Sequence, residues 1–170
     1  MRGVYKAIAT RLQNLWSGRF AELSTNAAQQ AGIEEAVADY WTRHNVTLHR
    51  RFTNAEESLA YFDWRNDQYF DYISLMPVNG QDGKVVLDYG CGPGNDLVGF
   101  ATQSKPQKLI GMDVSVSSLE EAKARLELHH AEGELHLLDP SNEHVPLPDA
   151  SVDFIHCSGV LHHIETPAHT

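Results

Sequence analysis

Three glycines and two acidic residues form the group in this sequence whose types and spacing most clearly indicate chemistry. Gly90, Gly92 and Gly94 alternate within "VVLDYGCGPGND" and place bare backbone directly after an apolar run. Asp88 stands just before the first glycine, and Asp113 lies 19 residues beyond the last. A glycine-rich turn followed by a carboxylate at about this distance is typical of a site for an adenosine-containing cofactor. The Asp113 carboxylate would accept hydrogen bonds from the ribose hydroxyls.

A site of this kind needs a strand, a tight turn and a helix in that order. The segment "KVVLDY" predicts a buried strand over residues 84–89, and "NDLVGFATQ" predicts a helix over residues 95–103. The amino terminus of that helix, near Asn95, offers free N–H groups and the positive end of the helix dipole. The elements that position the glycines are therefore predicted on both sides of them.

The alternation of strand and helix continues after the turn. Ser118 and Glu121, spaced as a capping box, predict the start of a helix within "SSLEEAKARLELHH". Alternating strands and helices indicate right-handed crossovers and a parallel sheet. The sequence therefore predicts an α/β fold with a Rossmann-like parallel sheet of four strands. The three further strands are predicted over residues 108–113, 134–139 and 152–158.

The region before the sheet has helical periodicity. "VYKAIATRLQNLW" and "NAAQQAGIEEAVADYWTRH" place apolar residues at helical spacing, and Asn54 with Glu57 forms a second capping box. A proline and "NGQDG" then interrupt the pattern. We therefore divide the chain into a helical N-terminal cap or lid, residues 1–80, and a Rossmann-like cofactor-binding domain, residues 81–170.

Composition and charge limit the classes of partner. The chain has 170 residues, a formal net charge of −10 and two cysteines, Cys91 and Cys157. Two cysteines cannot form a disulfide framework and are not spaced as a zinc pair, so we expect a cytoplasmic setting and no metal. Residues 1–51 are slightly basic, whereas the remainder is acidic and so disfavours general nucleic-acid binding. No apolar run is long enough to span a bilayer.

The residues in and beside the turn favour one class of adenosine cofactor over another. A dinucleotide-binding turn has its third glycine at the position occupied here by Asn95. Asp88 would also place a negative charge beside a pyrophosphate, whereas it is complementary to a ligand that carries an ammonium group. A nucleotide-dependent oxidoreductase is therefore disfavoured.

The turn and the segments after it resemble those of a known family. "VLDYGCGPGND" is similar to motif I of the class I S-adenosylmethionine-dependent methyltransferases. "IGMDVS" and "LLDPSNEHVPLPDASVDFIHCSGVLHHI" extend the resemblance in order. The resemblance implies that the cofactor is S-adenosyl-L-methionine and that the protein transfers its methyl group. It also implies a seven-stranded sheet, of which this chain supplies strands one to four, so residues 81–170 form a C-terminally incomplete domain.

Positions that match the family's motifs imply a set of cofactor-binding residues. Asp88 and the backbone of Gly90 would bind the methionine amino group, and Asp113 would bind the ribose. Pro140 has no N–H at the position where the family usually offers one to adenine, so Ser141 is expected to replace that contact. The full set adds Cys91, Gly92, Gly94 and Asn95 in the turn, Val114 and Asp139 beside the adenine, and Cys157 and Ser158 beside the sulfonium and the acceptor.

The chemistry of methyl transfer explains why no catalytic residue is predicted. The cofactor carries the reactive group, so the protein has to orient the reactants and exclude water. His162 and His163 are interpreted as an ordinary helix start, with a general base as the alternative.

Trp64, Arg65 and Tyr69 either join the helical region to the sheet or face the active site as part of a lid. The acidic main body favours a small-molecule acceptor.

A sheet that stops at its fourth strand leaves one edge of that strand without a neighbour. Either the chain is a fragment of a longer enzyme, or this edge pairs with a second copy or with another chain. This edge is also the basis of the alternative function. In that alternative the protein is a non-catalytic module that binds the cofactor or interacts with a partner through this strand.

Overall fold

The computed structural model describes residues 27–45, 50–68, 77–140 and 144–164, so the helical pattern "VYKAIATRLQNLW" lies outside the described residues. The described residues form a parallel sheet of four strands in the order β3-β2-β1-β4. The predicted Rossmann-like parallel sheet is therefore confirmed. The strands are β1 (Val85–Tyr89), β2 (Lys108–Asp113), β3 (Glu134–Leu137) and β4 (Phe154–His156).

The strand β1 lies at the centre of the sheet because it has a parallel neighbour on each side. Leu87 of β1 lies opposite Ile110 of β2 and Ile155 of β4. The strands β3 and β4 are shorter than predicted and end before Asp139 and Cys157 respectively. Since all four strands run in one direction, their carboxyl ends meet at a single edge, which is where ligands bind in open α/β sheets.

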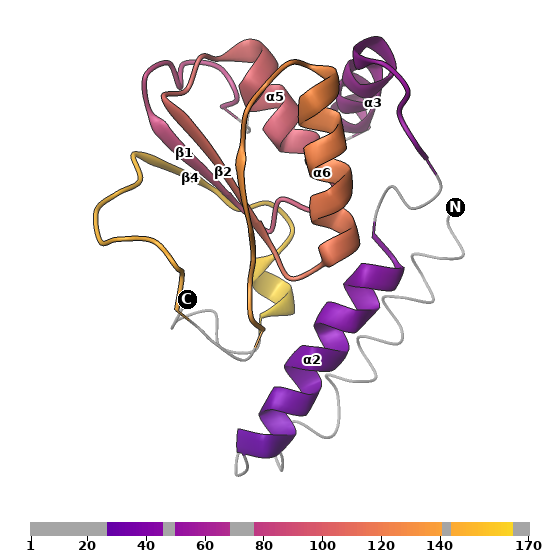
Figure 1. Ribbon diagram of the computed structural model, residues 1–170, viewed down its shortest axis with the longest axis vertical. Coiled ribbons are helices and arrows are strands. Elements are labelled where there is room, and N and C mark those ends of the chain that lie inside the picture. Colours follow the sequence, from indigo (N-terminus) through magenta and orange to yellow (C-terminus); the bar gives the residue numbers. More distant parts are fainter. Residues whose placement is uncertain (1–26, 46–49, 69–76, 141–143, 165–170) are drawn as a thin grey trace.

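The helices α5 (Asn95–Gln103) and α6 (Val116–Leu128) cover one face of the sheet, and α3 (Ala55–Asp67) packs against both of them (Figure 1). Phe62 of α3 and Phe100 of α5 are completely buried in this layer. The helical region before the sheet therefore shares a core with it. The core consists of Phe62, Val78, Val86, Cys91, Leu97, Phe100, Leu109, Ala122 and Leu126.

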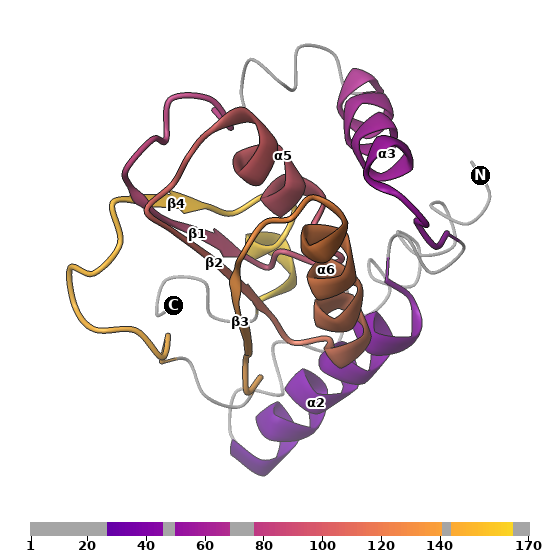
Figure 2. The ribbon, with the colours of Figure 1, turned by 45° about the horizontal axis from the view of Figure 1, so that its top comes forward.

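The opposite face of the sheet is covered by the loop before β4, with no helix from the described residues upon it. Figure 2 shows this loop on the side away from α5 and α6. Ile155 lies on the same face as Leu87 and is 62% exposed, so the apolar surface near β4 is incompletely covered. The small core here is formed by Leu87, Ile110 and Met112, with Val145, Leu147 and Val152 of the loop packed against it.

The two capping predictions had different outcomes. Asn54 caps α3, and its side-chain oxygen accepts the N–H of Glu57 at 2.9 Å. The Glu57 carboxylate accepts from the N–H and the hydroxyl of Thr53, one residue before the predicted position. The capping box at Ser118 is wrong, because α6 begins almost directly after β2. Ser115 caps this helix, and its Oγ accepts the N–H of Ser118 at 3.2 Å.

The helix α2 (Ala27–Arg43) lies beyond the carboxyl edge of the sheet (Figure 1). The Ser115 hydroxyl, which follows β2, donates to the Trp41 carbonyl in the last turn of α2 at 3.3 Å. The Trp41 ring also contacts the ring of His163 edge-on, with 5.1 Å between centroids. His163 belongs to η2 (Leu161–His163), a short 3-10 helix that follows β4. The helix α2 therefore links the segments that follow two different strands.

Candidate functional site

The glycine turn leaves the carboxyl end of β1 and folds back against β2. The N–H groups of Gly90 and Cys91 both donate to the Met112 carbonyl, at 2.8 and 2.9 Å. The N–H of Gly94 donates to the Cys91 carbonyl at 3.0 Å and closes the turn directly before α5. Gly90, Gly92 and Gly94 have φ values of 74°, 51° and 75°, a region that residues with side chains rarely adopt. The backbone of the turn therefore requires glycine.

The three glycines also differ in what surrounds them. A Cβ at Gly90 would overlap the side chain of Val160, which follows β4. A Cβ at Gly94 would lie 2.9 Å from the Cα of Ala122 in α6. At Gly92 nothing in the described part of the chain lies within 4 Å of a Cβ. Close packing within the protein therefore accounts for Gly90 and Gly94, and Gly92 is the position with room for a ligand.

Asp113 ends β2 with its carboxylate turned toward the glycine turn. Its Oδ2 accepts the N–H of Gly92 at 2.8 Å, and its Oδ1 accepts the N–H of Ser115 at 2.8 Å. Burial raises the pKa of the Asp113 carboxyl above its ordinary value, although the N–H donors oppose this rise. Each oxygen keeps acceptor capacity, so the carboxylate is held in place and can still accept ligand hydroxyls.

Asp88 lies near the end of β1 and is only 2% exposed. Its Oδ2 is buried and has no hydrogen-bond partner among the described residues. Burial, and then the negative charge of Asp96, raises the pKa of Asp88 to about 8, while His156 and Arg65 oppose the rise. Because an unsatisfied buried carboxylate is costly, this oxygen is suited to a cationic donor supplied by a ligand.

Asp96, in the first turn of α5, is the centre of an ionic cluster that the sequence analysis missed. Arg65 of α3 donates to Oδ1 of Asp96 at 3.0 Å, and Nε2 of His156 in β4 donates to Oδ2 at 3.2 Å. Burial opposes the ionisation of Asp96, but these partners outweigh it and keep its pKa below the ordinary value. Burial lowers the pKa of His156, yet the bond to Asp96 and the charge of Asp88 raise it more, for a net increase.

Arg125 of α6 is a second buried charge that the sequence analysis missed. Its side chain is inaccessible to solvent and donates to the Oγ and to the carbonyl of Ser58 in α3, both at 3.0 Å. It also donates to the Pro93 carbonyl in the glycine turn at 3.4 Å and to Oδ1 of Asn95 at 3.3 Å. The guanidinium carbon lies 4.5 Å from the centroid of the Phe52 ring. Arg125 therefore connects α3 with the turn that precedes α5.

Two of the predicted site residues turn their side chains into the protein. Cys91 is 6% exposed and packs in the main core, where burial raises the pKa of its thiol well above the ordinary value. The Asn95 side chain is buried, accepts from Arg125 and donates through Nδ2 to Asp96 at 3.3 Å. The backbone of Cys91 and Asn95 is thus what these residues can offer to a cofactor.

The remaining predicted residues follow the carboxyl ends of strands. Val114 comes directly after β2 and is half-buried, whereas Asp139 lies two residues beyond β3 and is exposed. Cys157 and Ser158 follow β4 and are half-buried, and burial raises the pKa of the Cys157 thiol. Ser141 lies outside the described residues. The structure therefore brings all of these residues except Ser141 to the edge that carries the glycine turn.

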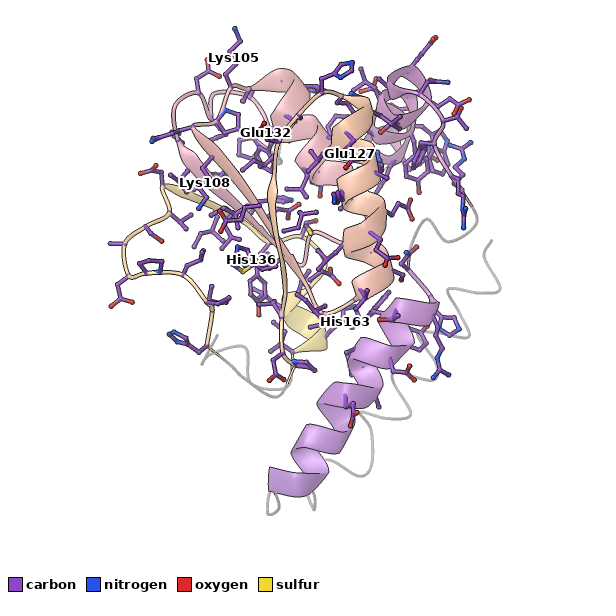
Figure 3. The ribbon with its side chains drawn as sticks, in the orientation of Figure 1. Lys105, Lys108, Glu127, Glu132, His136 and His163 are labelled. Atoms are coloured by element: carbon purple, nitrogen blue, oxygen red, sulfur yellow. The ribbon has the colours of Figure 1, made fainter. Side chains whose placement is uncertain are left out.

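The aromatic segment predicted as a candidate lid contributes one residue to this edge. Arg65 joins the ionic cluster, Trp64 is 48% exposed, and Tyr69 lies outside the described residues. The side chain of Trp41 in α2 approaches the edge from another direction, against His163. Figure 3 shows His163 in the region between η2 and α2.

The residues at this edge fit a ligand that carries both an ammonium group and a ribose. Considering the described residues alone, Asp88 provides a buried oxygen without a hydrogen-bond partner, Asp113 provides a fixed carboxylate, and Gly92 leaves open space beside it. Since Asp113 ends β2 and Asp88 lies on β1, the two carboxylates come from adjacent strands. S-adenosyl-L-methionine carries both of the groups that this arrangement would recognise.

The family described as "Methyltransferase domain" matches residues 86–170, which is half of the chain. The chain therefore belongs to the methyltransferase domain family. The family resemblance identified from the sequence is confirmed at the level of this domain family.

Relatives with assigned activities are similar to part of this chain. The malonyl-[acyl-carrier protein] O-methyltransferase of Marinomonas sp. is 30% identical over 112 residues, covering 65% of this chain and 40% of the relative. The trans-aconitate 2-methyltransferase of Afipia carboxidovorans is 33% identical over 73 residues, covering 43% and 28% respectively. The chain thus spans less than half the length of these relatives.

Solved structures share the fold. Geranyl diphosphate C-methyltransferase from Streptomyces coelicolor A3(2), solved with S-adenosyl-L-homocysteine, matches with a TM-score of 0.55 at 16% identity. The match covers 80% of this chain and 59% of that protein. At this identity the similarity shows the fold alone.

Proposed function

We propose that the chain binds S-adenosyl-L-methionine at the carboxyl edge of the sheet and transfers its methyl group to a small-molecule acceptor. The observation that carries the proposal is the placement of Asp88, Gly92 and Asp113 together at that edge. Asp88 would accept the methionine ammonium, and Asp113 the ribose hydroxyls. The backbone of Gly90, Cys91, Gly92, Gly94 and Asn95 would face the cofactor between these two acids.

The bound cofactor supplies the electrophilic methyl group, so the residues of the chain need only orient the reactants and exclude water. Val114, Asp139 and Ser141 are proposed to border the adenine. Cys157 and Ser158, after β4, are proposed to border the sulfonium and the acceptor. Residues 1–80 would act as the cap over this edge, and residues 81–170 as the cofactor-binding domain.

The class of methyl acceptor is proposed from the net charge of the chain and from its relatives, and the cellular compartment from its composition. Trans-aconitate, the substrate named for one relative, is a small molecule. A net charge of −10 disfavours polyanionic acceptors such as nucleic acids. Among the described residues, no helix combines the length and the apolar character needed to cross a membrane. A cytoplasmic setting is proposed from the scarcity of cysteine.

Calorimetric titration with S-adenosyl-L-homocysteine, which keeps the ammonium group and the ribose, tests the proposed site. Asp113→Ala should weaken binding by about 1–3 kcal/mol because it removes charged acceptors from the ribose. Asp149→Ala, at an exposed position in the loop on the far face, is the matched control. Unchanged affinity in Asp113→Ala would contradict the ribose assignment. A wild-type protein that binds NAD and not S-adenosyl-L-homocysteine would overturn the proposed function.

We also propose association through the edge of β4, beside which the side chain of Ile155 is exposed on the face of the sheet. Within the described residues, β1 is the one strand that pairs with β4. The partner would be a second copy or another chain. Ile155→Thr should reduce self-association in light scattering over a concentration series. A protein that stays monomeric at every concentration, with or without this change, would exclude self-association.

A further inference from the structure

His156 and Asp88 are neighbours on the two adjacent strands β4 and β1. Their Cα atoms are direct partners in the parallel register, so both side chains point to the same face of the sheet. The first turn of α5 lies over that face and carries Asp96, which accepts from Nε2 of His156. The imidazole also packs against the ring of Phe100, with 5.6 Å between centroids. His156 is therefore a buried imidazole fixed beside the carboxyl groups of Asp88 and Asp96.

The charged groups that face Asp88 come from every element packed around it. They are Asp96 of α5, His156 of β4, Arg65 of α3 and Asp113 of β2. Arg65 and His156 are both bonded to Asp96, so the carboxylate of Asp96 has two cationic partners. In the part of the chain that the structure describes, Asp88 has no such partner for its buried oxygen. Burial also raises the pKa values of the neighbouring thiols of Cys91 and Cys157.

We propose that His156 is a positioning residue of the cofactor site, which fixes Asp96 and supplies the positive charge beside which Asp88 ionises when a ligand ammonium binds. The inference rests on the proposed function, because it requires a ligand with an ammonium group. In the free protein Asp88 is protonated at neutral pH, since burial raises its pKa to about 8. Binding of an ammonium ion, which already carries its proton, then releases the carboxyl proton of Asp88 to water.

Because binding releases a proton, the affinity for the ligand should increase as the pH rises. Below about pH 8, S-adenosyl-L-homocysteine should bind about tenfold more tightly for each unit of increase in pH, and the gain should level off above that value. At pH 7 binding should release about one proton per ligand. Without the positive charge of His156 the pKa of Asp88 would rise further, so the levelling would move to higher pH.

The experiment measures the dissociation constant of S-adenosyl-L-homocysteine from pH 6 to pH 9 in wild type and in His156→Gln. The control is His136→Gln on β3 (Figure 3), whose imidazole pairs with Glu134 outside the cluster. An upward shift of the profile in His156→Gln, with the control unchanged, is expected. If that variant does not fold, His156→Phe, which keeps a ring against Phe100, is measured in the same way.

The possible failures are distinguishable. Wild-type binding with the same pH profile in both His156 variants would overturn the role of His156 and leave the proposed function standing. Calorimetry of the wild type in buffers of different ionisation enthalpy counts the released protons without any variant. A count of zero at pH 7 would overturn the ionisation of Asp88. Absence of wild-type binding at every pH would overturn the proposed function and this inference together.

Discussion

Gly92 and Gly94 separate the ligand-binding role of the turn from its structural role. Both have positive φ, and for alanine this backbone costs about 1–2 kcal/mol. In Gly94→Ala the new Cβ would also lie 2.9 Å from the Cα of Ala122, and overpacking against backbone adds about 1–3 kcal/mol. We expect Gly94→Ala to lose about 2–5 kcal/mol of unfolding free energy, and Gly92→Ala about 1–2 kcal/mol.

Ligand binding should follow the opposite order. The Cβ of Gly92→Ala would enter the open space where the cofactor is proposed to lie, so this variant should lose affinity for S-adenosyl-L-homocysteine. The folded fraction of Gly94→Ala should bind more nearly as wild type does, because its Cβ would face α6. Urea denaturation measures the first quantity and calorimetric titration the second. Equal destabilisation of the two variants, or full affinity in Gly92→Ala, would refute the reasoning.

Two further predictions concern buried charges. Burial raises the pKa of Asp88 to about 8. The contribution of the Asp88 carboxyl to the free energy of unfolding of the apo protein is therefore fully present below pH 4 and is lost as the pH rises to about 8. Asp88→Asn should therefore be more stable than wild type to thermal unfolding at pH 8.5 and close to it at pH 4, while its affinity for the ligand ammonium falls. Arg125→Met leaves the acceptors of Ser58 and Pro93 buried without their donor and should lose about 1–3 kcal/mol in urea denaturation. Lys123→Met, at an exposed position on the same helix, should lose little, and equal losses would contradict the role of Arg125.

The sheet and the glycine turn could be predicted because their signals are local. The strand "KVVLDY" runs directly into the glycines, and Asp113 closes the next strand of the same strand–helix–strand unit, so one short segment of the chain specifies this part of the fold. The start of α6 was misplaced for a similar reason. Ser115 and Ser118 are both capable caps, and the end of β2 decides between them by fixing where the chain turns.

The ionic cluster could not be predicted because its members are far apart in the sequence. Arg65 lies 31 residues from Asp96, and His156 lies 60 residues from it. In the sequence Asp96 is only an acid in the first turn of a helix, which indicates a favourable interaction with the helix dipole. His156 stands within an apolar strand pattern, where the register with β1 determines which residue it faces. The packing of α3 against α5 and the pairing of β4 with β1, which no local pattern specifies, therefore created the cluster.

The glycine turn is held by three residues that lie outside the motif itself, one after β4 and two on α6. Val160 packs on Gly90, Ala122 packs on Gly94, and Arg125 binds the Pro93 carbonyl. The spacing of the glycines in a sequence therefore reports dense packing as much as it reports a ligand. Asp88 distinguishes a turn that binds a ligand from a turn that only packs closely. Its buried oxygen has no partner in the described protein and gains nothing from close packing. A purely structural turn would have no reason to keep an ionisable group there, whereas a site for an ammonium ligand requires one.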